Sequence, residues 1–256
     1  MHSLPYDSKQ AYDEMNEAKH MQINRQFGAL EGPFIFDAHH HHDGCVEMGE
    51  HSHDPARLLV LLHGWGADGR DLADLGAPLQ SMMPDLGVWC PNAPHICSAN
   101  PMGRQWFELT DRFFSHPEEA LPEMQEMAYL IEGAIDEMCQ EMGLLPQDVI
   151  LAGFSQGGMM TLHSATENRL QAAGFASLSG ALVGTSLSSQ DAAHRILLAH
   201  GSADEVVPFA ASREAQSLLE EAGHHVDFLA REGLGHGIDM AVLEGLGQFC
   251  HAVTAE

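Results

Sequence analysis

The sequence predicts an α/β fold in which helices cover both faces of a mainly parallel sheet. From Arg57 to the C-terminus, short apolar runs alternate with segments of helical periodicity, which is the order of parallel strands and their crossover helices. The chain has 256 residues, of which 45% are hydrophobic, and this is enough to bury one complete core. We therefore predict one main domain over residues 57–256, preceded by an N-terminal extension over residues 1–56.

The N-terminal extension differs in composition from the rest of the chain. Helical periodicity predicts a helix from Ser8 to Phe27, and a turn then leads into the apolar piece 34–36. Residues 39–54 are dense in histidine, cysteine and carboxylate side chains, which bind zinc, nickel or copper. Consecutive histidines point in different directions, so we expect a solvated loop with adventitious metal affinity and assign no metal. The nearest candidates for ligands are His39, His41, His51 and His53.

Apolar runs and periodic segments predict the elements of the main domain. The expected strands span residues 57–62, 86–90, 149–152, 173–178, 195–199 and 225–230. The expected helices span residues 72–82, 118–142, 208–222 and 238–253, and a further helix ends near residue 167. The first of these helices should be interrupted at Pro78.

The helix over 118–142 has the clearest pattern. Gly143 follows it and suits the left-handed residue that commonly ends a helix. Its apolar residues recur at steps of three and four, which predicts a stripe packed against the sheet rather than a ligand site. The stripe consists of Met124, Met127, Ile131, Ala134 or Ile135, Met138 and Met142.

Residues 91–117 form a long stretch without clear periodicity, rich in proline and aromatic residues. Loops of this length in compact domains are usually lids or walls of binding sites. Trp106, Phe107, Phe113 and Phe114 are candidates for an apolar pocket there, and covering the edge of the core is an equally good role for them.

The formal net charge is −26, and both lysines, Lys9 and Lys19, lie in the first twenty residues. Binding to nucleic acid or to anionic lipid requires clustered cations, so this surface is expected to repel both. The acidic residues either form an ordinary solubilising face or adapt the protein to high salt, which screens such self-repulsion.

The cysteines and the first ten residues indicate the cellular compartment in which the protein is expected to work. The five cysteines are odd in number and lack C-x-x-C spacing, which predicts reduced thiols. Met1 to Gln10 is polar and does not resemble a signal peptide, and no apolar run has the length of a membrane span. We therefore expect a cytoplasmic protein.

The sequence G-F-S-Q-G over residues 153–157 is the most informative motif in the chain. It lies between an apolar run and residues that suit a helix, which is the context of a nucleophile elbow around Ser155. Gly153 and Gly157 would be needed because a sharp turn leaves no room for side chains two positions on either side. The alternative is a glycine-rich turn in an α/β protein of another kind.

A serine becomes a nucleophile only beside a base, and the base needs a carboxylate to fix its tautomer. Two later strands are followed by glycine-rich loops that offer these groups at the same edge of the sheet. The first loop offers Asp204 or Glu205, and the second offers His236. His200 is a rival base, although it directly ends a strand and a structural role suits it better.

Four blocks of sequence together resemble the bacterial phospholipase/carboxylesterase family of α/β-hydrolases, relatives of the acyl-protein thioesterases. They are L-H-G-W-G-A-D-G at 62–69, M-G-R-Q-W-F at 102–107, G-F-S-Q-G-G at 153–158, and H-G-S-A-D-E-V-V-P followed by G-H-G-I-D. The resemblance implies an α/β-hydrolase fold without a large cap domain, and it covers the chain from about Leu58 to its end. The His-rich run departs from the family pattern.

The resemblance also implies roles for particular residues. Ser155 would be the nucleophile, Asp204 the orienting acid and His236 the base. The backbone N–H groups of Trp65 and Gln156 would form the oxyanion hole. His63 would hold the oxyanion loop.

Relatives commonly carry another apolar residue or tyrosine at the position of Trp65, so the bulky tryptophan is expected to narrow or reshape the acyl site. The proposed pocket residues are Trp106, Phe107 and Met159.

These observations predict a serine carboxylesterase that needs no cofactor, with residues 57–256 as its catalytic domain. An acyl thioesterase or a lysophospholipase would use the same three side chains. A metal-binding protein and a non-catalytic module of this fold are the alternatives outside the enzymes. The expected partners are a small-molecule or acyl ester substrate and a second copy of the chain in a homodimer, without nucleic acid or stable membrane insertion.

Overall fold

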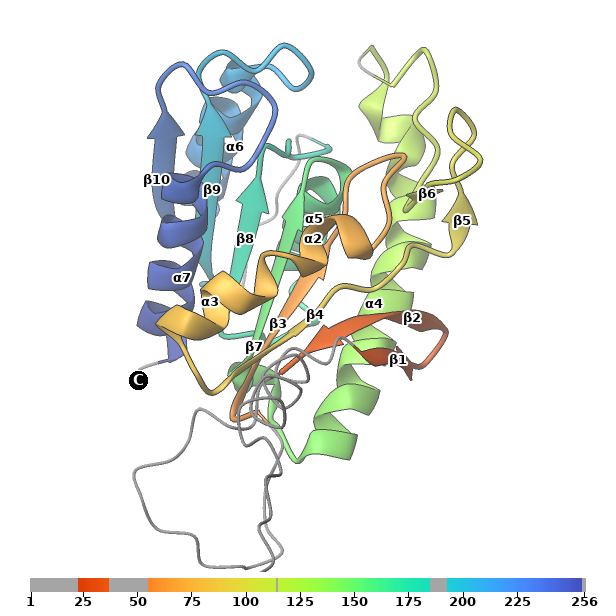
Figure 1. The fold of residues 1–256 in the computed structure, drawn as a ribbon. Coiled ribbons are helices and arrows are strands. Elements are labelled where there is room, and N and C mark those ends of the chain that lie inside the picture. Colours follow the sequence, from red (N-terminus) through yellow and green to blue (C-terminus); the bar gives the residue numbers. More distant parts are fainter. Residues whose placement is uncertain (1–22, 37–54, 114, 185–192, 255–256) are drawn as a thin grey trace, which may run out of the picture.

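The computed structural model describes residues 23–36, 55–113, 115–184 and 193–254. Its centre is an eight-stranded sheet with the order β1-β2-β4-β3-β7-β8-β9-β10 (Figure 1). The neighbouring strands β4, β3, β7, β8, β9 and β10 run parallel to one another. At one edge, β2 pairs antiparallel with β4, and β1 pairs antiparallel with β2. The predicted mainly parallel α/β fold is therefore confirmed.

The strands of the main sheet lie close to the predicted runs. They are β1 (Ile23–Phe27), β2 (Leu30–Ile35), β3 (Arg57–Leu62), β4 (Leu86–Trp89), β7 (Val149–Phe154), β8 (Gly174–Leu178), β9 (Arg195–Gly201) and β10 (His225–Arg231). The short strands β5 (His95–Ile96) and β6 (Arg104–Gln105) form a separate hairpin.

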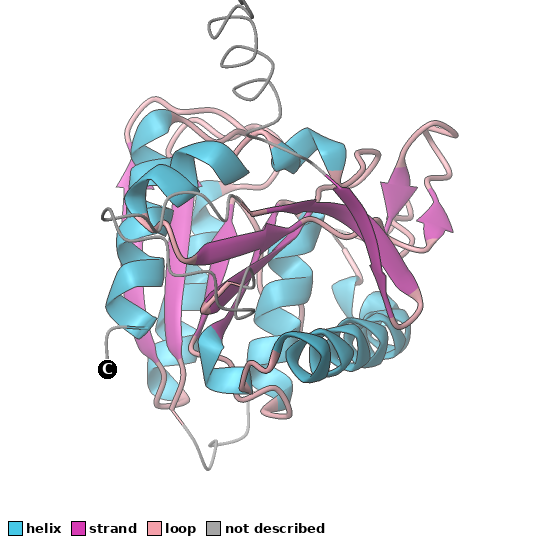
Figure 2. Cartoon of the chain, turned by 60° about the horizontal axis from the view of Figure 1, so that its bottom comes forward, coloured by secondary structure: helices cyan, strands magenta, loops and turns pink. Residues whose placement is uncertain are grey.

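Helices cover both faces of the twisted sheet (Figure 2). They are α2 (Arg70–Ala73), α3 (Gly76–Met82), α4 (Leu121–Met142), α5 (Gln156–Glu167), α6 (Phe209–Glu221) and α7 (Met240–Thr254). One-turn 3₁₀ helices precede α4 (Pro117–Ala120) and β7 (Pro146–Asp148).

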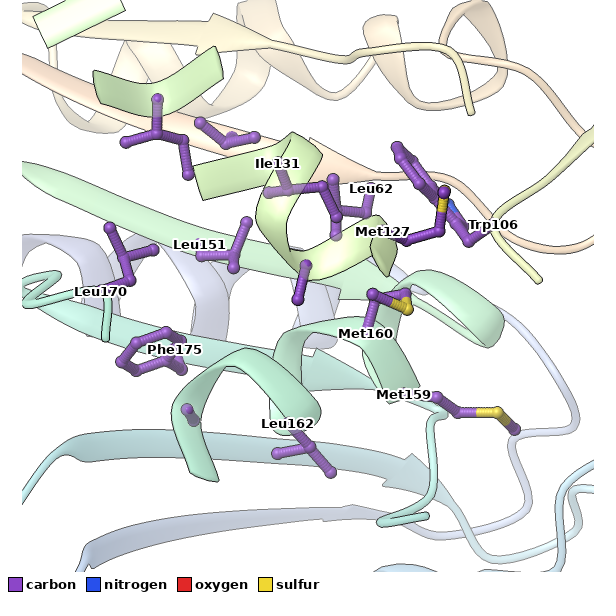
Figure 3. Packing of buried hydrophobic residues seen from close by; sticks show 14 of the residues in the cluster. Leu62, Trp106, Met127, Ile131, Leu151, Met159, Met160, Leu162, Leu170 and Phe175 are labelled. Carbon is purple, nitrogen blue, oxygen red and sulfur yellow. The ribbon is translucent and has the colours of Figure 1, made fainter. Parts of the chain in front are cut away.

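The core has two halves because successive strand residues point to opposite faces. Leu58, Val60 and Leu62 of β3 pack with α4, α5 and α6, whereas Leu59 and Leu61 pack with α2, α3 and α7. The methionine stripe of α4 lies in the first half of the core. There Met127 and Ile131 lie over the sheet in one cluster with the strand residues Leu62 and Leu151 (Figure 3). The predicted role of this stripe is confirmed, and Gly143 ends the helix with a φ of 69°.

The N-terminal boundary differs from the prediction. Residues 23–27 form a strand instead of the end of a helix, and with β2 they make a hairpin that extends the main sheet. Burial explains the difference: Phe27 is fully buried, with its ring 5.2 Å from that of Trp89 on β4. The sheet thus includes residues that were predicted to belong to the N-terminal extension. The rest of the helix predicted from Ser8 to Phe27, residues 8–22, and the His-rich run lie outside the described residues.

The helical segment after β3 is interrupted, but before Pro78 rather than at it. The gap falls at residues 74 and 75, and α3 restarts at Gly76. Pro78 then occupies the first turn of α3, where a backbone N–H has no partner within the helix.

The sheet predicts a contrast between two leucines. Leu151→Ala removes a fully buried side chain from β7 and should lower the free energy of unfolding by about 2–5 kcal/mol. Leu145→Ala removes one that is 55% exposed, so it should cost no more than about 0.5 kcal/mol. Urea denaturation of both variants measures the difference, and equal losses would contradict the described position of β7.

Candidate active site

The turn between β7 and α5 holds Ser155 in a strained backbone conformation. Its φ is 55° and its ψ is −113°, values that a residue with a side chain rarely adopts. Helix α5 begins at the next residue, so the predicted order of strand, sharp turn and helix is confirmed. The serine side chain lies at the carboxyl edge of the sheet.

Two glycines make this turn sterically feasible. A Cβ atom on Gly157 would lie 2.1 Å from the carbonyl oxygen of Leu62 on β3. A Cβ atom on Gly153 would lie 2.2 Å from the carbonyl carbon of Gly157. The close approach of α5 to β3 thus requires glycine at position 157, and the sharp turn from β7 into α5 requires it at position 153. This is the mechanical role expected from the sequence.

Asp204 and His236 meet at the same edge, on the loops that follow β9 and β10. Nδ1 of His236 lies 2.8 Å from Oδ2 of Asp204, within hydrogen-bonding distance. Oδ1 of Asp204 accepts from the backbone N–H groups of Val206 and Val207, at 2.8 and 2.9 Å. The carboxylate therefore fixes the histidine ring, because both of its oxygens are held.

The carboxyl group of Asp204 is fully buried, and burial alone would raise its pKa. The hydrogen bonds from His236 and from the two valine N–H groups outweigh burial, so the pKa lies below its ordinary value. Asp204 is consequently ionised at neutral pH, the form that stabilises a protonated imidazole.

Glu205, the alternative acid, and His200, the alternative base, do not line the cavity with Ser155. Glu205 is exposed. His200 is buried, with Nε2 donating to the carbonyl oxygen of Val207 at 2.9 Å and Nδ1 bonded to the Ser212 hydroxyl. Nε2 of His200 also lies 3.2 Å from Oδ2 of Asp204, so this histidine supports the acid from inside the protein.

Ser155 and His236 line one cavity of about 580 Å³. The imidazole packs against Phe154, with ring centroids 4.9 Å apart. Among the described residues no hydrogen bond joins the Ser155 hydroxyl to His236, a contact that is often long in such sites before substrate binds. The rest of the wall is mostly apolar and includes Trp65, Leu72, Leu75, Leu109, Phe113, Met159, Val206 and Ile238.

The loop after β3 is held by His63, which is fully buried. Nε2 of His63 accepts from the Ala93 N–H at 3.0 Å, which leaves Nδ1 to donate to the Gly64 carbonyl at 2.7 Å. Burial lowers the pKa of His63, so its ring is neutral and this pattern persists. The indole of Trp106 donates to the His63 carbonyl at 2.9 Å.

Gln156 ties the start of α5 to the segment after β6. Its Oε1 accepts from the Trp106 N–H at 2.9 Å, and its Nε2 donates to the Phe107 carbonyl at 2.7 Å. The backbone around the first turn of α5 and the loop after β3 therefore form one hydrogen-bonded unit beside Ser155.

The pocket predictions are partly wrong. Met159 lines the cavity, but Trp106 and Phe107 do not, because both are fully buried in the core behind the loop after β3. Trp65 takes their place, with its indole donating to Oε1 of Gln105 at 3.0 Å. Phe114 lies outside the described residues.

The sequence analysis missed other wall residues because it assigned them to core helices or to no element. Leu72 and Ile238 each follow a glycine-rich loop at the carboxyl end of a strand, and this position is the signal that would have found them. Leu109 lies in the long loop, where no pattern singled it out, whereas Phe113 of the same loop was a predicted pocket candidate and does line the cavity.

No metal is assigned from the sequence, and the nearest candidate ligands, His39, His41, His51 and His53, lie outside the described residues. Within the described residues, no three histidine, cysteine or acidic side chains come close enough together to hold a metal ion.

Known proteins resemble this chain over most of its length. A model of the phospholipase/carboxylesterase family matches residues 43–254. Carboxylesterase SOBER1 of Arabidopsis thaliana is 33% identical over 70% of this chain and 83% of its own. Lysophospholipase-like protein 1 of Mus musculus is 29% identical over 72% of this chain and 80% of its own. The crystal structure of esterase PE8 superposes with a TM-score of 0.74 at 30% identity, covering 88% of this chain and 99% of that one.

The elbow predicts opposite outcomes for two glycine substitutions. Gly157→Ala should lower the free energy of unfolding by about 1–3 kcal/mol or more, because the new methyl group meets the backbone of β3. Gly133 lies on the exposed face of α4, where an added Cβ would come within 4 Å of no other part of the described chain beyond its neighbours and its own helix backbone. Gly133→Ala should therefore stabilise the protein by about 0.5–1 kcal/mol. Thermal and urea denaturation compare the two, and a neutral Gly157→Ala would show that the close approach is not required.

Proposed function

Because this chain belongs to the phospholipase/carboxylesterase family, whose members include carboxylic ester hydrolases, we propose that Ser155, His236 and Asp204 act as its catalytic triad. The observation that carries this proposal is the hydrogen bond between His236 and the buried Asp204, at the cavity that Ser155 also lines. The chain is accordingly a serine hydrolase of the carboxylesterase type, and its esterase chemistry needs no cofactor.

The mechanism follows from the arrangement. Nε2 of His236 removes the proton of the Ser155 hydroxyl as the oxygen attacks the ester carbonyl, because Asp204 keeps the other ring nitrogen protonated. The resulting imidazolium then gives the proton to the leaving alcohol, and an acyl-enzyme remains on Ser155. Water attacks the acyl-enzyme with His236 again as base, which restores the serine and releases the acid.

The backbone N–H groups of Trp65 and Gln156 are the proposed oxyanion hole. Support comes from the rigidity of both carriers: His63 holds the loop that bears Trp65, and the Gln156 side chain is bonded at both of its polar atoms. In a comparable site each such donor is worth roughly 3 kcal/mol of transition-state stabilisation.

The choice of substrate is a separate part of the proposal. A mostly apolar cavity suits a small-molecule or acyl ester, and a thioester or a lysophospholipid would use the same triad. We propose a carboxylic ester as the preferred substrate, and we place the protein in the cytoplasm because the described cysteines Cys90, Cys97, Cys139 and Cys250 are free and buried.

Other partners follow from the charge and the helices. The net charge of −26 disfavours nucleic acid. None of the helices among the described residues combines the length and the apolar character needed to cross a bilayer. A homodimer stays part of the proposal.

Two serine substitutions test the nucleophile. Ser155→Ala should reduce hydrolysis of p-nitrophenyl butyrate by about 10⁴-fold or more in kcat/KM with the fold retained. Ser164→Ala is the matched control, since this buried hydroxyl on the helix that follows Ser155 has no hydrogen-bond partner among the described residues and its removal should leave kcat/KM unchanged. Full activity in Ser155→Ala, measured on protein with a native circular dichroism spectrum, would refute the assignment.

Trp65 should limit the length of the acyl chain. Trp65→Ala opens one wall of the cavity, so the ratio of kcat/KM for a decanoate ester over a butyrate ester should rise by about ten-fold. Trp65→Phe keeps an aromatic wall and removes the hydrogen bond to Gln105, so it should change the ratio much less. An unchanged ratio in Trp65→Ala, across a series of p-nitrophenyl esters, would mean that other residues set the chain length.

A further inference from the structure

A second cavity, of about 430 Å³, lies beside the loop that follows β3 and shares no lining residue with the active-site cavity. Its polar lining comes from four separate parts of the chain. Asn24 lies on β1, Asp68 and Arg70 at the start of α2, Asn92 after β4 and Arg104 on β6. Its residues are mostly polar, in contrast to the active-site wall.

Asp68 and Arg70 cancel each other's charge in this second cavity. Nε and Nη2 of Arg70 both donate to the Asp68 carboxylate, at 3.1 and 2.6 Å to Oδ2. The hydrogen bond from Arg70 holds the pKa of Asp68 below its ordinary value, so the carboxylate stays ionised and paired. The remaining charge of the cavity is the guanidinium of Arg104.

Arg104 is unusual because this acidic chain pairs nearly all of its arginines. Of the nine arginines in the described residues, seven form an ion pair with a carboxylate. Arg213 is satisfied in another way, bonded to Gln216 and stacked 4.7 Å from the ring centre of Phe228. Arg104 has only the Pro94 carbonyl, which accepts from Nη1 at 3.3 Å, and its Nε and Nη2 bond to nothing among the described residues.

Carboxamide donors lie in the same cavity. Oδ1 of Asn92 accepts from the Gly69 N–H at 2.9 Å, which fixes the amide so that Nδ2 is left as a donor without a partner among the described residues. Asn24 is exposed on the edge strand and brings a second carboxamide. A guanidinium fork beside amide N–H groups matches the oxygens of a phosphate or a carboxylate.

We propose that this cavity, around Arg104, Asn92 and Asn24, is a binding site for a small oxyanion, a phosphate or carboxylate group, separate from the ester site. Backbone hydrogen bonds connect it to the loop that carries Trp65. The Arg104 N–H donates to the Ala67 carbonyl at 2.7 Å, and the Gly66 N–H donates to the Arg104 carbonyl at 2.9 Å. An anion bound by the Arg104 side chain is therefore held directly behind the loop that carries Trp65.

Isothermal titration calorimetry with inorganic phosphate tests the proposal without reference to ester turnover. Ionic strength is held constant with sodium chloride, because a chain of net charge −26 responds to salt in general. The wild-type protein should show saturable binding of one phosphate. Arg104→Gln should weaken that binding by about ten-fold or more, since it removes the charged donor.

Two further variants make the result specific. Arg213→Gln removes the other arginine without a carboxylate partner and should bind phosphate as the wild type does. Asn24→Ala alters an exposed side chain and should weaken binding by about three-fold with the fold intact. Absence of saturable binding to the wild type, or wild-type affinity in Arg104→Gln, would overturn the proposal.

A parallel titration with succinate identifies the chemistry of the anion. Tighter binding of phosphate than of succinate supports a phosphate-bearing ligand, and the reverse order supports a carboxylate. Ester hydrolysis is measured separately on the wild type and on the same variants. A wild-type protein that hydrolyses esters but shows no saturable phosphate binding would refute this site and leave the proposed esterase untouched.

Discussion

The close contact between the start of α5 and the end of β3 determines the rest of the site. Because a Cβ atom on Gly157 would collide with the Leu62 carbonyl, the helix that begins after Ser155 lies against the strand that leads into the loop bearing Trp65. This approach of two backbones accompanies the strained turn at Ser155 and brings Ser155, Gln156 and Trp65 to one cavity. The strain at Ser155 is retained because hydrogen bonds and packing from both elements surround it.

The parallel sheet supplies the other half of the arrangement. The carboxyl ends of β7, β9 and β10 lie at one edge, so loops more than thirty residues apart in the chain bring Asp204 and His236 to within 2.8 Å of each other. The buried carboxylate of Asp204 keeps its charge through hydrogen bonds, and Nε2 of the buried His200 lies 3.2 Å from its Oδ2. The site therefore depends on backbone geometry first and on the individual side chains second.

The sequence predicted the parts of this structure that have short-range signals. Periodicity found the main strands and α4, and the glycines around Ser155 marked the elbow. It failed where tertiary contacts decide. Residues 23–27 have some helical periodicity, but burial of Phe27 against Trp89 makes them a strand. Trp106 and Phe107 are aromatic residues in a long loop, and only their hydrogen bonds and burial show that they belong to the core rather than to the cavity wall.

The central claim is that one hydroxyl, that of Ser155, is activated by its surroundings. Labelling with a fluorophosphonate probe, followed by mass spectrometry of the peptides, tests it most directly. We expect one probe per chain, attached to Ser155, and no labelling once the chain has been unfolded in urea. Attachment to another residue of the folded protein, or no attachment at all, would contradict it.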